Sequence, residues 1–400
     1  MKDRSDGSPG ALKDPLSIAF LSHVASPRAP TGAERVLATL ATGMRRRGHR
    51  VAVAAPDGWC LEPELLHAGV EVEHLSARAC WLTYYEPRPW PVAALKWMRW
   101  AWPQTATLRI ARWLRRWKAD VVHVNCLPQI RGARAARMAG KPTIWHLHEI
   151  LPPGRRRRWL AGNVAESATR VVAVSEAVGR WVAEEGLAER MRVVHNGVAI
   201  PSQVEDVTAA RRELGLPDDG VLFGLFGQVT PHKGTMSFIE AGCRALTAND
   251  DLRFVVAGAG PKPFRQRVRQ AMESTGRSDR FHLLDPQPGS DRLNAAADVV
   301  CLTTTTPDPL PCAVMEAMAS ARPVVAFDSG GTSEMVRNGE TGLLVPTGNV
   351  EELAGAFVRL ARDPTARVEM GLAGERRARE VFSIERQLNT LEGLFRGLVP

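Results

Sequence analysis

The sequence has no apolar run long enough to cross a membrane. A membrane-spanning helix needs about 18 or more consecutive apolar residues, and a secretory signal needs an apolar segment near the N-terminus. The opening stretch, MKDRSDGSPGALKDP, is polar, and the later apolar runs are short. We therefore expect a cytoplasmic protein, for which any contact with the inner face of the cytoplasmic membrane would be peripheral.

Cysteine and histidine patterns that hold metal ions are also missing. The six cysteines, at positions 60, 80, 126, 243, 301 and 312, form no CxxC pair and no zinc-finger spacing. No cluster of histidines and aspartates indicates another metal site. We predict reduced, packed thiols, no metal ligands and no cofactor.

The GxGxxG loop of dinucleotide-binding enzymes does not occur at the first strand-to-helix crossover, where the chain reads SPRAPTGAE. This disfavours a dehydrogenase. The spacings of known nucleic-acid-binding modules are absent as well, so no nucleic acid is expected as a partner. The formal net charge of +9 then favours other anionic partners, such as phosphorylated small molecules or a membrane surface.

The chain does contain two series of short apolar runs that alternate with helical segments. The first series includes LSIAF, VAVAAP, DVVHVN and PTIWHLHE, and the second includes VLFGLFG, LRFVVAGAG, ADVVCLT and RPVVAFD. Such alternation predicts a parallel sheet with helices on both faces. Because 400 residues exceed one usual core, we predict an α/β chain of two tandem doubly wound, Rossmann-like domains facing a cleft.

Shifts in composition give the expected boundaries. Residues 1–15 form a polar tail, 16–198 the N-terminal domain, 199–220 a linker, 221–375 the C-terminal domain, and 376–400 a C-terminal helix that can cross back to the N-terminal domain. Sheets of this kind bind ligands at the loops beyond the carboxyl ends of their strands. The site residues are therefore expected in those loops.

The stretch FGQVTPHKGTMSFIEA leads from a predicted strand into a predicted helix. Gly227 permits close approach of a ligand to the backbone, the helix start after Gly234 offers N–H groups, and Lys233 adds a positive charge. These features favour a diphosphate site. The alternative is a tight turn with a solvated lysine, because glycine spacings of this kind are common.

A second stretch, TPDPLPCAVMEAMASARPVVAFDSGG, covers residues 306–331. Its prolines predict a helix that begins near Leu310 or Pro311. Backbone N–H groups of Leu310, Cys312 and Ala313 are then available to an anion, which the helix dipole favours at this end.

Two acidic residues flank this helix start. Asp308 lies at its mouth, where it is either a simple cap or a ligand-binding group. Glu316 lies among apolar residues, so we predict that it is buried and needs a partner. The partner is either a ribose diol or the guanidinium of Arg322.

Together these motifs resemble those of the retaining glycosyltransferases of family 4, which have the two-domain GT-B fold. The resemblance runs from about Leu16 to Arg386 and includes TGAERVLATLATGMRRRGHRV, in which Gly32 belongs to the family's first glycine-rich loop. The family's Glu-x7-Glu, Gly-x5-Lys-Gly and Gly-Gly-x-x-Glu patterns fall on Asp308 and Glu316, on Gly227, Lys233 and Gly234, and on Gly330, Gly331 and Glu334. Aspartate thus replaces the first glutamate, Gln228 stands where many relatives have arginine, and Asp285 stands where glycine is usual.

The resemblance implies a nucleotide-sugar donor, which is a substrate and not a cofactor, held mainly by the C-terminal domain. The implied donor-binding residues are Gly32, Gly227, Gln228, Lys233, Leu310, Pro311, Cys312 and Glu316. Lys233 would neutralise the diphosphate and Glu316 would bind the ribose. The implied catalytic residues are His148, at the transferred sugar, and Asp308, at the donor sugar or its phosphates, although a strand-end histidine is often only structural.

No nucleophile with an adjacent base is evident in the sequence. The resemblance implies metal-independent front-face substitution with retention, in which the leaving diphosphate assists deprotonation of the acceptor. The expected acceptor is a glycan or a polyprenyl-diphosphate-linked saccharide, in cell-surface polysaccharide or glycoconjugate synthesis. Two alternatives remain: a nucleotide-sugar 2-epimerase, which needs no acceptor, and a catalytically silent nucleotide-sugar or glycan-binding protein.

Tryptophan is concentrated in the first half of the chain, where the two longest runs of arginine also lie. All eleven tryptophans lie between Trp59 and Trp181. The helical spacing of residues 110, 113, 114 and 117 predicts a core-facing helix. The segment before it, through Pro103, and a loop expected at GRRRRW, residues 154–159, suit an anionic membrane interface. A solvated run of charge is the alternative for either element.

Overall fold

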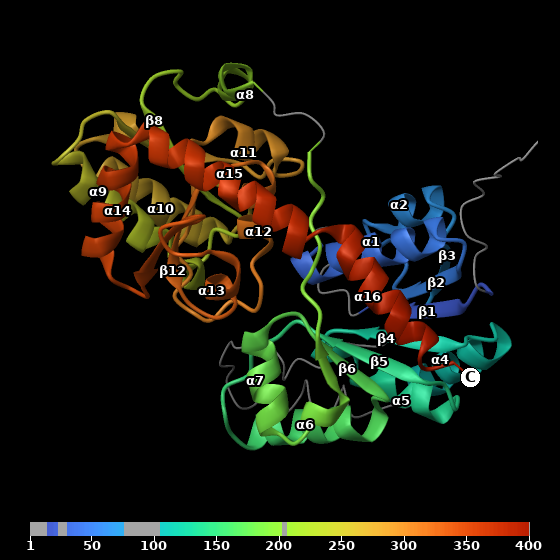
Figure 1. Cartoon of the computed structure of the whole chain (residues 1–400). Helices are drawn as coiled ribbons and strands as arrows, with labels where there is room; N and C mark the ends of the chain where they lie inside the picture. Colours follow the sequence, from blue (N-terminus) through green and yellow to red (C-terminus); the bar gives the residue numbers. More distant parts are fainter. Residues whose placement is uncertain (1–13, 23–29, 76–104, 202–205, 400) are drawn as a thin grey trace, which may run out of the picture. The chain divides into compact units, whose positions relative to one another are not determined.

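The structure is a computed structural model of the chain, in which residues 14–22, 30–75, 105–201 and 206–399 are described. The tryptophan-rich stretch from Trp81 to Pro103 lies outside these residues. The described residues form two compact units, each built around a parallel sheet (Figure 1). The prediction of two tandem α/β domains with parallel sheets is confirmed.

The two units do not follow the expected boundaries throughout. The first unit contains the residues up to Ala173, Val182–Arg192, and those from Leu388 onward. The second contains Val174–Trp181 and Val193–Gln387. The connection expected at 199–220 thus belongs to the second unit, and the last helix is shared between the two.

The first sheet has seven strands in the order β3-β2-β1-β4-β5-β6-β7. The strands are β1 (Ser17–Leu21), β2 (Arg50–Ala55), β3 (Glu71–His74), β4 (Val121–Asn125), β5 (Thr143–Leu147), β6 (Arg170–Ala173) and β7 (Met191–Val193). In β4 and β5 every residue is buried, because helices cover both faces of a parallel sheet.

The helices along this part of the chain are α1 (Gly32–Arg46), α2 (Glu62–His67), α4 (Thr105–Arg116), α5 (Ile130–Met138), α6 (Arg155–Ser167), α7 (Glu176–Glu184) and α16 (Ile384–Arg396), with the 3-10 turns η2 (Leu127–Gln129) and η3 (Ala188–Arg190). The GRRRRW stretch is therefore not a loop, because its four arginines form the first turn of α6. The prediction of a core-facing helix at residues 110–117 holds, since Ile110, Trp113, Leu114 and Trp117 are buried.

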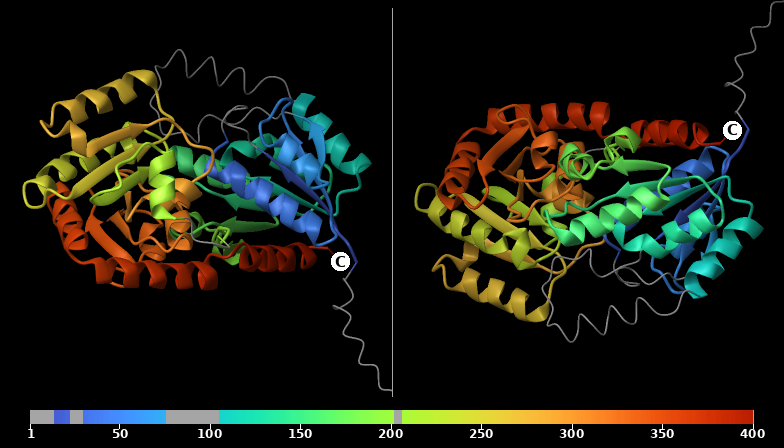
Figure 2. Two further views of the ribbon diagram at one scale, coloured as in Figure 1. Left: turned by 90° about the horizontal axis from the view of Figure 1, so that it is seen from above. Right: turned by 90° about the horizontal axis from the view of Figure 1, so that it is seen from below.

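Helix α16 packs on α1 in the first unit (Figure 2). A Cβ atom on Gly43 would lie 2.6 Å from the Leu388 side chain, so the glycine permits this close approach. The ion pair between Arg47 and Glu392, 2.9 Å apart, lies at the same contact. These contacts hold α16 against α1.

The second sheet has six strands in the order β10-β9-β8-β11-β12-β13. They are β8 (Val221–Phe226), β9 (Leu252–Ala257), β10 (Phe281–Leu284), β11 (Val299–Leu302), β12 (Val324–Asp328) and β13 (Gly342–Pro346). The helices are α8 (Val207–Glu213), α9 (Thr235–Leu246), α10 (Lys262–Glu273), α11 (Asp291–Ala296), α12 (Cys312–Ala319), α13 (Thr332–Met335), α14 (Val350–Arg362) and α15 (Pro364–Val381), with the turns η4 (Pro231–Lys233) and η5 (Ser278–Arg280).

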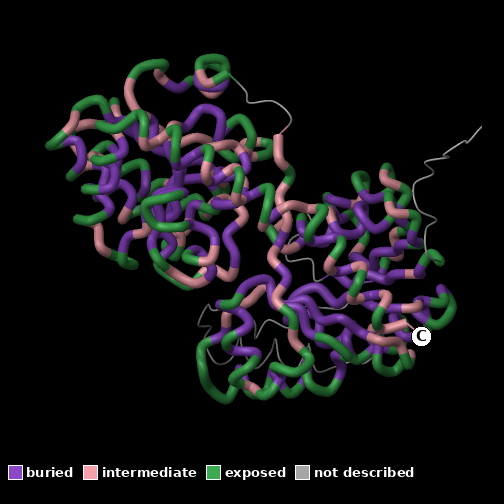
Figure 3. Tube along the Cα trace, viewed as in Figure 1, coloured by how far each residue is buried: buried purple, intermediate pink, exposed green. Residues whose placement is uncertain are grey.

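Phenylalanines fill the core between this sheet and its helices. The ring of Phe223 lies 5.7 Å from that of Phe254 and 4.9 Å from that of Phe357. All three are fully buried, and the strands appear as buried segments within exposed helices (Figure 3). This rigid core places the strand ends of the second unit.

None of the helices among the described residues is both long and apolar enough to span a bilayer. The described cysteines are free thiols: Cys60, Cys126, Cys243, Cys301 and Cys312.

Candidate functional site

Two loops meet at the carboxyl ends of β8 and β11, which are neighbours in the second sheet. The Lys233 ammonium lies 2.6 Å from a carboxylate oxygen of Asp308, although the two residues are 75 positions apart. Their side chains are 26% and 14% exposed. A half-buried ion pair at this edge of the sheet occupies the place where such folds bind ligands.

Backbone geometry holds Lys233 in this position. Gly234, which precedes α9, has a φ of 69°, a left-handed conformation that glycine adopts readily. A Cβ atom on Gly234 would lie 1.7 Å from the Thr303 carbonyl oxygen. The Thr303 hydroxyl donates to the carbonyl oxygens of Lys233 (3.1 Å) and Gly234 (3.0 Å). The lysine turn is thereby attached to the loop after β11.

Alanine substitutions at Gly234 and Gly276 should separate the cost of a left-handed backbone conformation from the cost of a steric clash with Thr303. Gly276 has the same φ of 69°, but a Cβ atom there would meet open space. Gly276→Ala should lower the free energy of unfolding by about 1 kcal/mol, from the left-handed conformation alone. Gly234→Ala should lower it by at least about 2–3 kcal/mol, because the loop must also move away from Thr303. Urea unfolding of both variants measures the difference, and equal losses would contradict the steric role.

The helix start after Asp308 lies close to where the prolines predict it. Pro311 is the N-cap of α12, the helix begins at Cys312, and no side chain caps it. The Val314 N–H donates to the Pro311 carbonyl oxygen (3.1 Å). The first turn of α12 therefore directly follows the loop that contains Asp308.

Gly330 and Gly331 pack against the backbone of the loop that contains Asp308. The Gly331 N–H donates to the Asp308 carbonyl oxygen (2.8 Å). Cβ atoms on Gly330 and Gly331 would lie 2.2 Å and 2.1 Å from the carbonyl oxygens of Asp308 and Pro309. The two glycines are thus required by close backbone packing.

The electrostatic environment of Cys312 shows which groups gather here. The pKa of its thiol is raised to about 12, mainly by burial and also by the negative charges of Glu316 and Asp308, whereas the charge of Lys233 lowers it. Two carboxylates and one ammonium therefore lie near the first turn of α12. Such clusters of charge are enriched at functional sites.

Glu316 differs from expectation in one respect. Its side chain is partly exposed and not buried, because it lies on the side of α12 that faces this cluster. Arg322, the alternative partner, donates to the Ala295 carbonyl oxygen (3.0 Å), and the charges that act on it are those of Asp298 and Arg211. Arg322 thus has partners elsewhere in the unit.

Arg265 was not identified from the sequence, yet it connects two neighbouring strand ends. Its guanidinium donates to the carbonyl oxygens of Gly258, after β9, and Leu284, at the end of β10. It also pairs with Asp285 (2.8 Å), the residue that stands where the family usually has glycine. Gly227 and Gln228 are exposed after β8, beside these loops.

Glu334 also has a role that the sequence did not reveal. Its carboxylate accepts hydrogen bonds from the backbone N–H groups of Glu176 and Ala177, each at 2.7 Å, at the start of α7. It also lies 3.2 Å from the His195 ring. Desolvation tends to raise the pKa of Glu334, but the hydrogen bonds from His195 and the two N–H groups outweigh it and lower the pKa below its usual value.

Glu334→Gln should reduce stability in a pH-dependent manner. A carboxyl group with a lowered pKa in the fold stabilises it above the unfolded pKa, near 4.5, and this contribution is lost as the pH falls through the lower folded value. We expect a loss of about 2 kcal/mol at neutral pH that shrinks below about pH 4.5. Urea unfolding across this range tests it, with exposed Glu340→Gln as control. A loss that does not depend on pH would contradict the ionic role.

His148 and Gly32 belong to the first unit. Gly32 is the first residue of α1, whose N-cap Thr31 forms a capping box with Glu34. His148 follows β5, and its ring centre lies 4.4 Å from that of buried His146. The backbone N–H of His148 donates to the Glu149 carboxylate (3.0 Å). The structure thus brings Lys233, Asp308, Cys312 and Glu316 together in the second unit, which also contains Gly227, Gln228, Leu310 and Pro311. It places His148 and Gly32 in the first unit.

Glu149 lies beside His148 and was not singled out from the sequence. Burial raises the pKa of its carboxyl to about 7, although the N–H groups of Leu127 and His148 favour the ionised form. Cys126, next to it, has a φ of 69°, which is uncommon for a residue other than glycine. Shifted pKa values and unusual backbone conformations are both enriched at functional sites.

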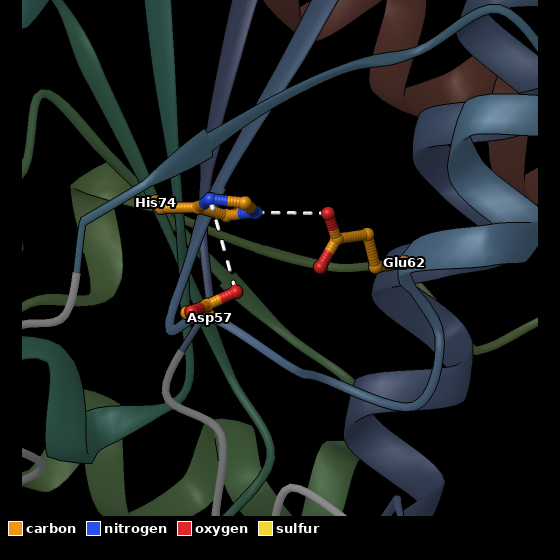
Figure 4. Close-up of side chains that lie close together, drawn as sticks. All are labelled: Asp57, Glu62 and His74. Carbon is orange, nitrogen blue, oxygen red and sulfur yellow. Dashed lines mark hydrogen bonds and ion pairs between the residues drawn. The ribbon is translucent and has the colours of Figure 1, made fainter.

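One group of possible metal ligands occurs among the described residues, at Asp57, Glu62 and His74 (Figure 4). The sequence spacing did not indicate it. The two ring nitrogens of His74 face different carboxylates: Nε2 lies 2.8 Å from Glu62 and Nδ1 lies 3.9 Å from Asp57. The hydrogen bond that His74 donates to the Glu62 carboxylate raises the pKa of His74. The arrangement fits an exposed histidine between two acids better than an ion coordinated from one side of the ring.

Two family models match this chain. Residues 30–200 match the model described as Glycosyltransferase Family 4, and residues 220–363 match Glycosyl transferases group 1. Alpha-maltose-1-phosphate synthase of Mycolicibacterium smegmatis is 30% identical over 299 residues, which cover 66% of this chain and 76% of that protein. The chain belongs to glycosyltransferase family 4. This confirms the family resemblance drawn from the sequence motifs.

Other members of the family extend the comparison. D-inositol 3-phosphate glycosyltransferase of Corynebacterium glutamicum is 32% identical over 193 residues, and the chain spans about half of its length (46%). The crystal structure of Anabaena HepE in complex with UDP superposes with a TM-score of 0.81 at 22% identity, over 96% of this chain and 100% of that one. The latter likeness shows the GT-B fold.

Proposed function

We propose that the protein transfers a sugar from a nucleoside-diphosphate sugar to an acceptor hydroxyl. The observation that carries this proposal is the ion pair between Lys233 and Asp308, 2.6 Å long, beside the first turn of α12. An ammonium has three N–H donors, so one hydrogen bond to Asp308 leaves donors for diphosphate oxygens. The N–H groups at the start of α12 add partial positive charge to the same place.

The roles proposed for the other residues that bind the nucleotide sugar follow from this placement. Glu316 lies one helical turn beyond Cys312, so its carboxylate is proposed to accept hydrogen bonds from the two ribose hydroxyls. Asp308 is proposed to contact the transferred sugar. Gly227, Gln228, Leu310 and Pro311 border the same loops. From the first unit, His148 and Gly32 are proposed to contact the sugar and the phosphate end of the donor, as the family resemblance implies.

The proposed reaction retains the configuration at the sugar carbon. The bond between C1 and the diphosphate oxygen breaks, and a bond from C1 to the acceptor oxygen forms on the same face. The acceptor proton passes to the leaving diphosphate, which is released as the nucleoside diphosphate. Lys233 and the α12 helix start stabilise the negative charge that develops on the leaving group.

We further propose that Lys233 and the helix start replace a divalent metal in this step. Enzyme treated with a chelator should then retain nearly all of its transfer rate. A rate that falls at least about tenfold after chelation, and is restored by divalent ions, would contradict this point.

The proposed acceptor is a glycan or a lipid-linked saccharide, in the synthesis of cell-surface polysaccharide or glycoconjugates. The names of both relatives described above contain a phosphorylated carbohydrate, inositol 3-phosphate or maltose 1-phosphate. An acceptor screen should therefore include phosphorylated polyols and sugars beside polyprenyl-diphosphate saccharides.

A thermal-shift panel of UDP-, GDP- and ADP-sugars tests the proposed function. One nucleotide series should raise the melting temperature, and Glu316→Gln should weaken that effect more for the ribonucleotide than for its 2′,3′-dideoxy analogue. Incubation with the donor alone separates a transferase from a 2-epimerase, which would convert it. A chain that responds to no nucleotide sugar would contradict the proposal.

A further inference from the structure

Three adjacent helices of the first unit carry almost only positive charge. α4 contains four arginines, α5 three and α6 four, whereas these described helices contain a single acidic residue, Glu166. α5 packs against both α4 and α6, and the three cover one face of the seven-stranded sheet (Figures 1 and 2). Their outer sides form one surface, which we name the α4–α6 face.

Part of the charge on the α4–α6 face has no counter-ion in the described part of the chain. Arg109 and Arg112 on α4, and Arg155 and Arg158 on α6, are exposed, and no described carboxylate pairs with them. Four unpaired guanidinium groups on neighbouring helices produce a positive field that attracts an anionic surface.

The arginines of α6 also oppose the stability of their own helix. They form its first turn, where there is no acidic residue and no side-chain cap. A helix N-terminus carries partial positive charge, so cations there are unfavourable. Arg157 is compensated by ion pairs with Glu184 (3.0 Å) and Glu185 (2.7 Å). Arg155 and Arg158 have no such ion pairs among the described residues. Their charge therefore does not stabilise the helix, which favours a role in binding a partner.

Each of the three helices also exposes one large apolar side chain. Leu108 on α4 is 41% exposed, Met138 on α5 is 44% exposed and Trp159 on α6 is 37% exposed. Figure 3 shows exposed residues along the outer side of α6. Exposed apolar groups among basic residues are typical of surfaces that lie on a bilayer.

We propose that the α4–α6 face docks on an anionic lipid bilayer. Anionic headgroups attract the arginines electrostatically, and the apolar side chains are buried at the boundary between headgroups and acyl chains. The phosphates of a nucleic acid would also attract the arginines, but a nucleic acid would not bury Leu108 or Met138. The surface lies within the first unit, and the inference does not depend on the donor site of the second unit.

Sedimentation of the full chain with phosphatidylcholine vesicles, with and without phosphatidylglycerol, tests the proposal. Wild type should bind only the anionic vesicles. Replacement of Arg109, Arg112, Arg155 and Arg158 by glutamine should weaken binding by at least about 100-fold, because each basic residue contributes on the order of fivefold. Leu108→Ser with Met138→Ser should weaken it by about tenfold or more.

A matched control lies on the second unit, where Val368 and Leu372 are 61% and 46% exposed on α15. Changing these to serine, with Arg359→Gln and Arg376→Gln, should leave vesicle binding unchanged. Thermal melting shows whether each variant folds. Because Arg155 and Arg158 disfavour α6, their replacement should not lower the melting temperature. If it does, Arg109→Gln with Arg112→Gln is measured instead, with about a 25-fold weakening expected.

Three results would overturn the proposal. The first is equal binding to neutral and anionic vesicles. The second is an equal loss of binding in the control variant. The third is tighter binding to a short RNA duplex than to vesicles, with dependence on the four arginines and none on Leu108 and Met138, which would identify a nucleic acid as the occupant.

Discussion

Lys233→Met should weaken binding of the nucleoside diphosphate by about 100-fold or more. The substitution keeps the length of the side chain but removes a hydrogen-bonded charge, and such bonds contribute about 1.5–3 kcal/mol each. It also leaves the Asp308 carboxylate, whose side chain is 14% exposed, unneutralised beside the incoming diphosphate. Isothermal titration calorimetry with the nucleotide selected by the thermal-shift panel measures the change.

Arg359→Met is the matched control for Lys233. It removes one positive charge from the same unit, and Arg359 is exposed in the last turn of α14. Helices of strand–helix units run back toward the amino ends of the strands, so this position lies away from the proposed site. The control should bind the nucleotide like wild type. Equal affinities for wild type and Lys233→Met would remove the lysine from the donor site.

Asp308→Asn should slow sugar transfer by about 100-fold or more while donor binding is retained. The amide cannot keep Lys233 in an ion pair, so the ammonium becomes fully available to the diphosphate. Affinity for the nucleoside diphosphate should therefore stay the same or increase, whereas the rate falls. The two effects have opposite directions, which a general loss of structure would not produce.

Two measurements separate these effects. Calorimetry gives the affinity for the nucleoside diphosphate, and single-turnover transfer to the acceptor found in the screen gives the rate. Asp308→Glu, which restores the acid of the family motif, should regain part of the rate lost in Asp308→Asn. If Asp308→Asn lost affinity and rate in equal measure, Asp308 would only position Lys233 and would not act on the sugar.

Local rules of backbone chemistry made much of the fold predictable. DVVHVN was predicted as a strand and forms β4, in which every residue is buried. A helix beginning near Pro311 was predicted from proline chemistry, and α12 begins one residue later. Both predictions depend on the periodicity of side chains and on the missing N–H of proline, which act over a few residues.

Contacts between distant residues could not be predicted in this way. The carboxylate of Glu334 binds the N–H of Glu176, 158 positions away, and nothing in either segment specifies the other. The arginine run at the start of α6 was predicted to be a loop, and cations do disfavour a helix N-terminus. Tertiary ion pairs of Arg157 and packing of the helix outweigh that local preference.

All of the proposed chemistry requires that a nucleotide sugar binds the second unit at Lys233, Asp308 and Glu316. A crystal structure of the protein with the nucleotide sugar selected by the thermal-shift panel tests it most directly. We expect diphosphate oxygens within hydrogen-bond distance of Lys233 and of the first N–H groups of α12, and ribose hydroxyls within hydrogen-bond distance of Glu316. A nucleotide bound with its diphosphate away from Lys233 and its ribose away from Glu316 would contradict the claim.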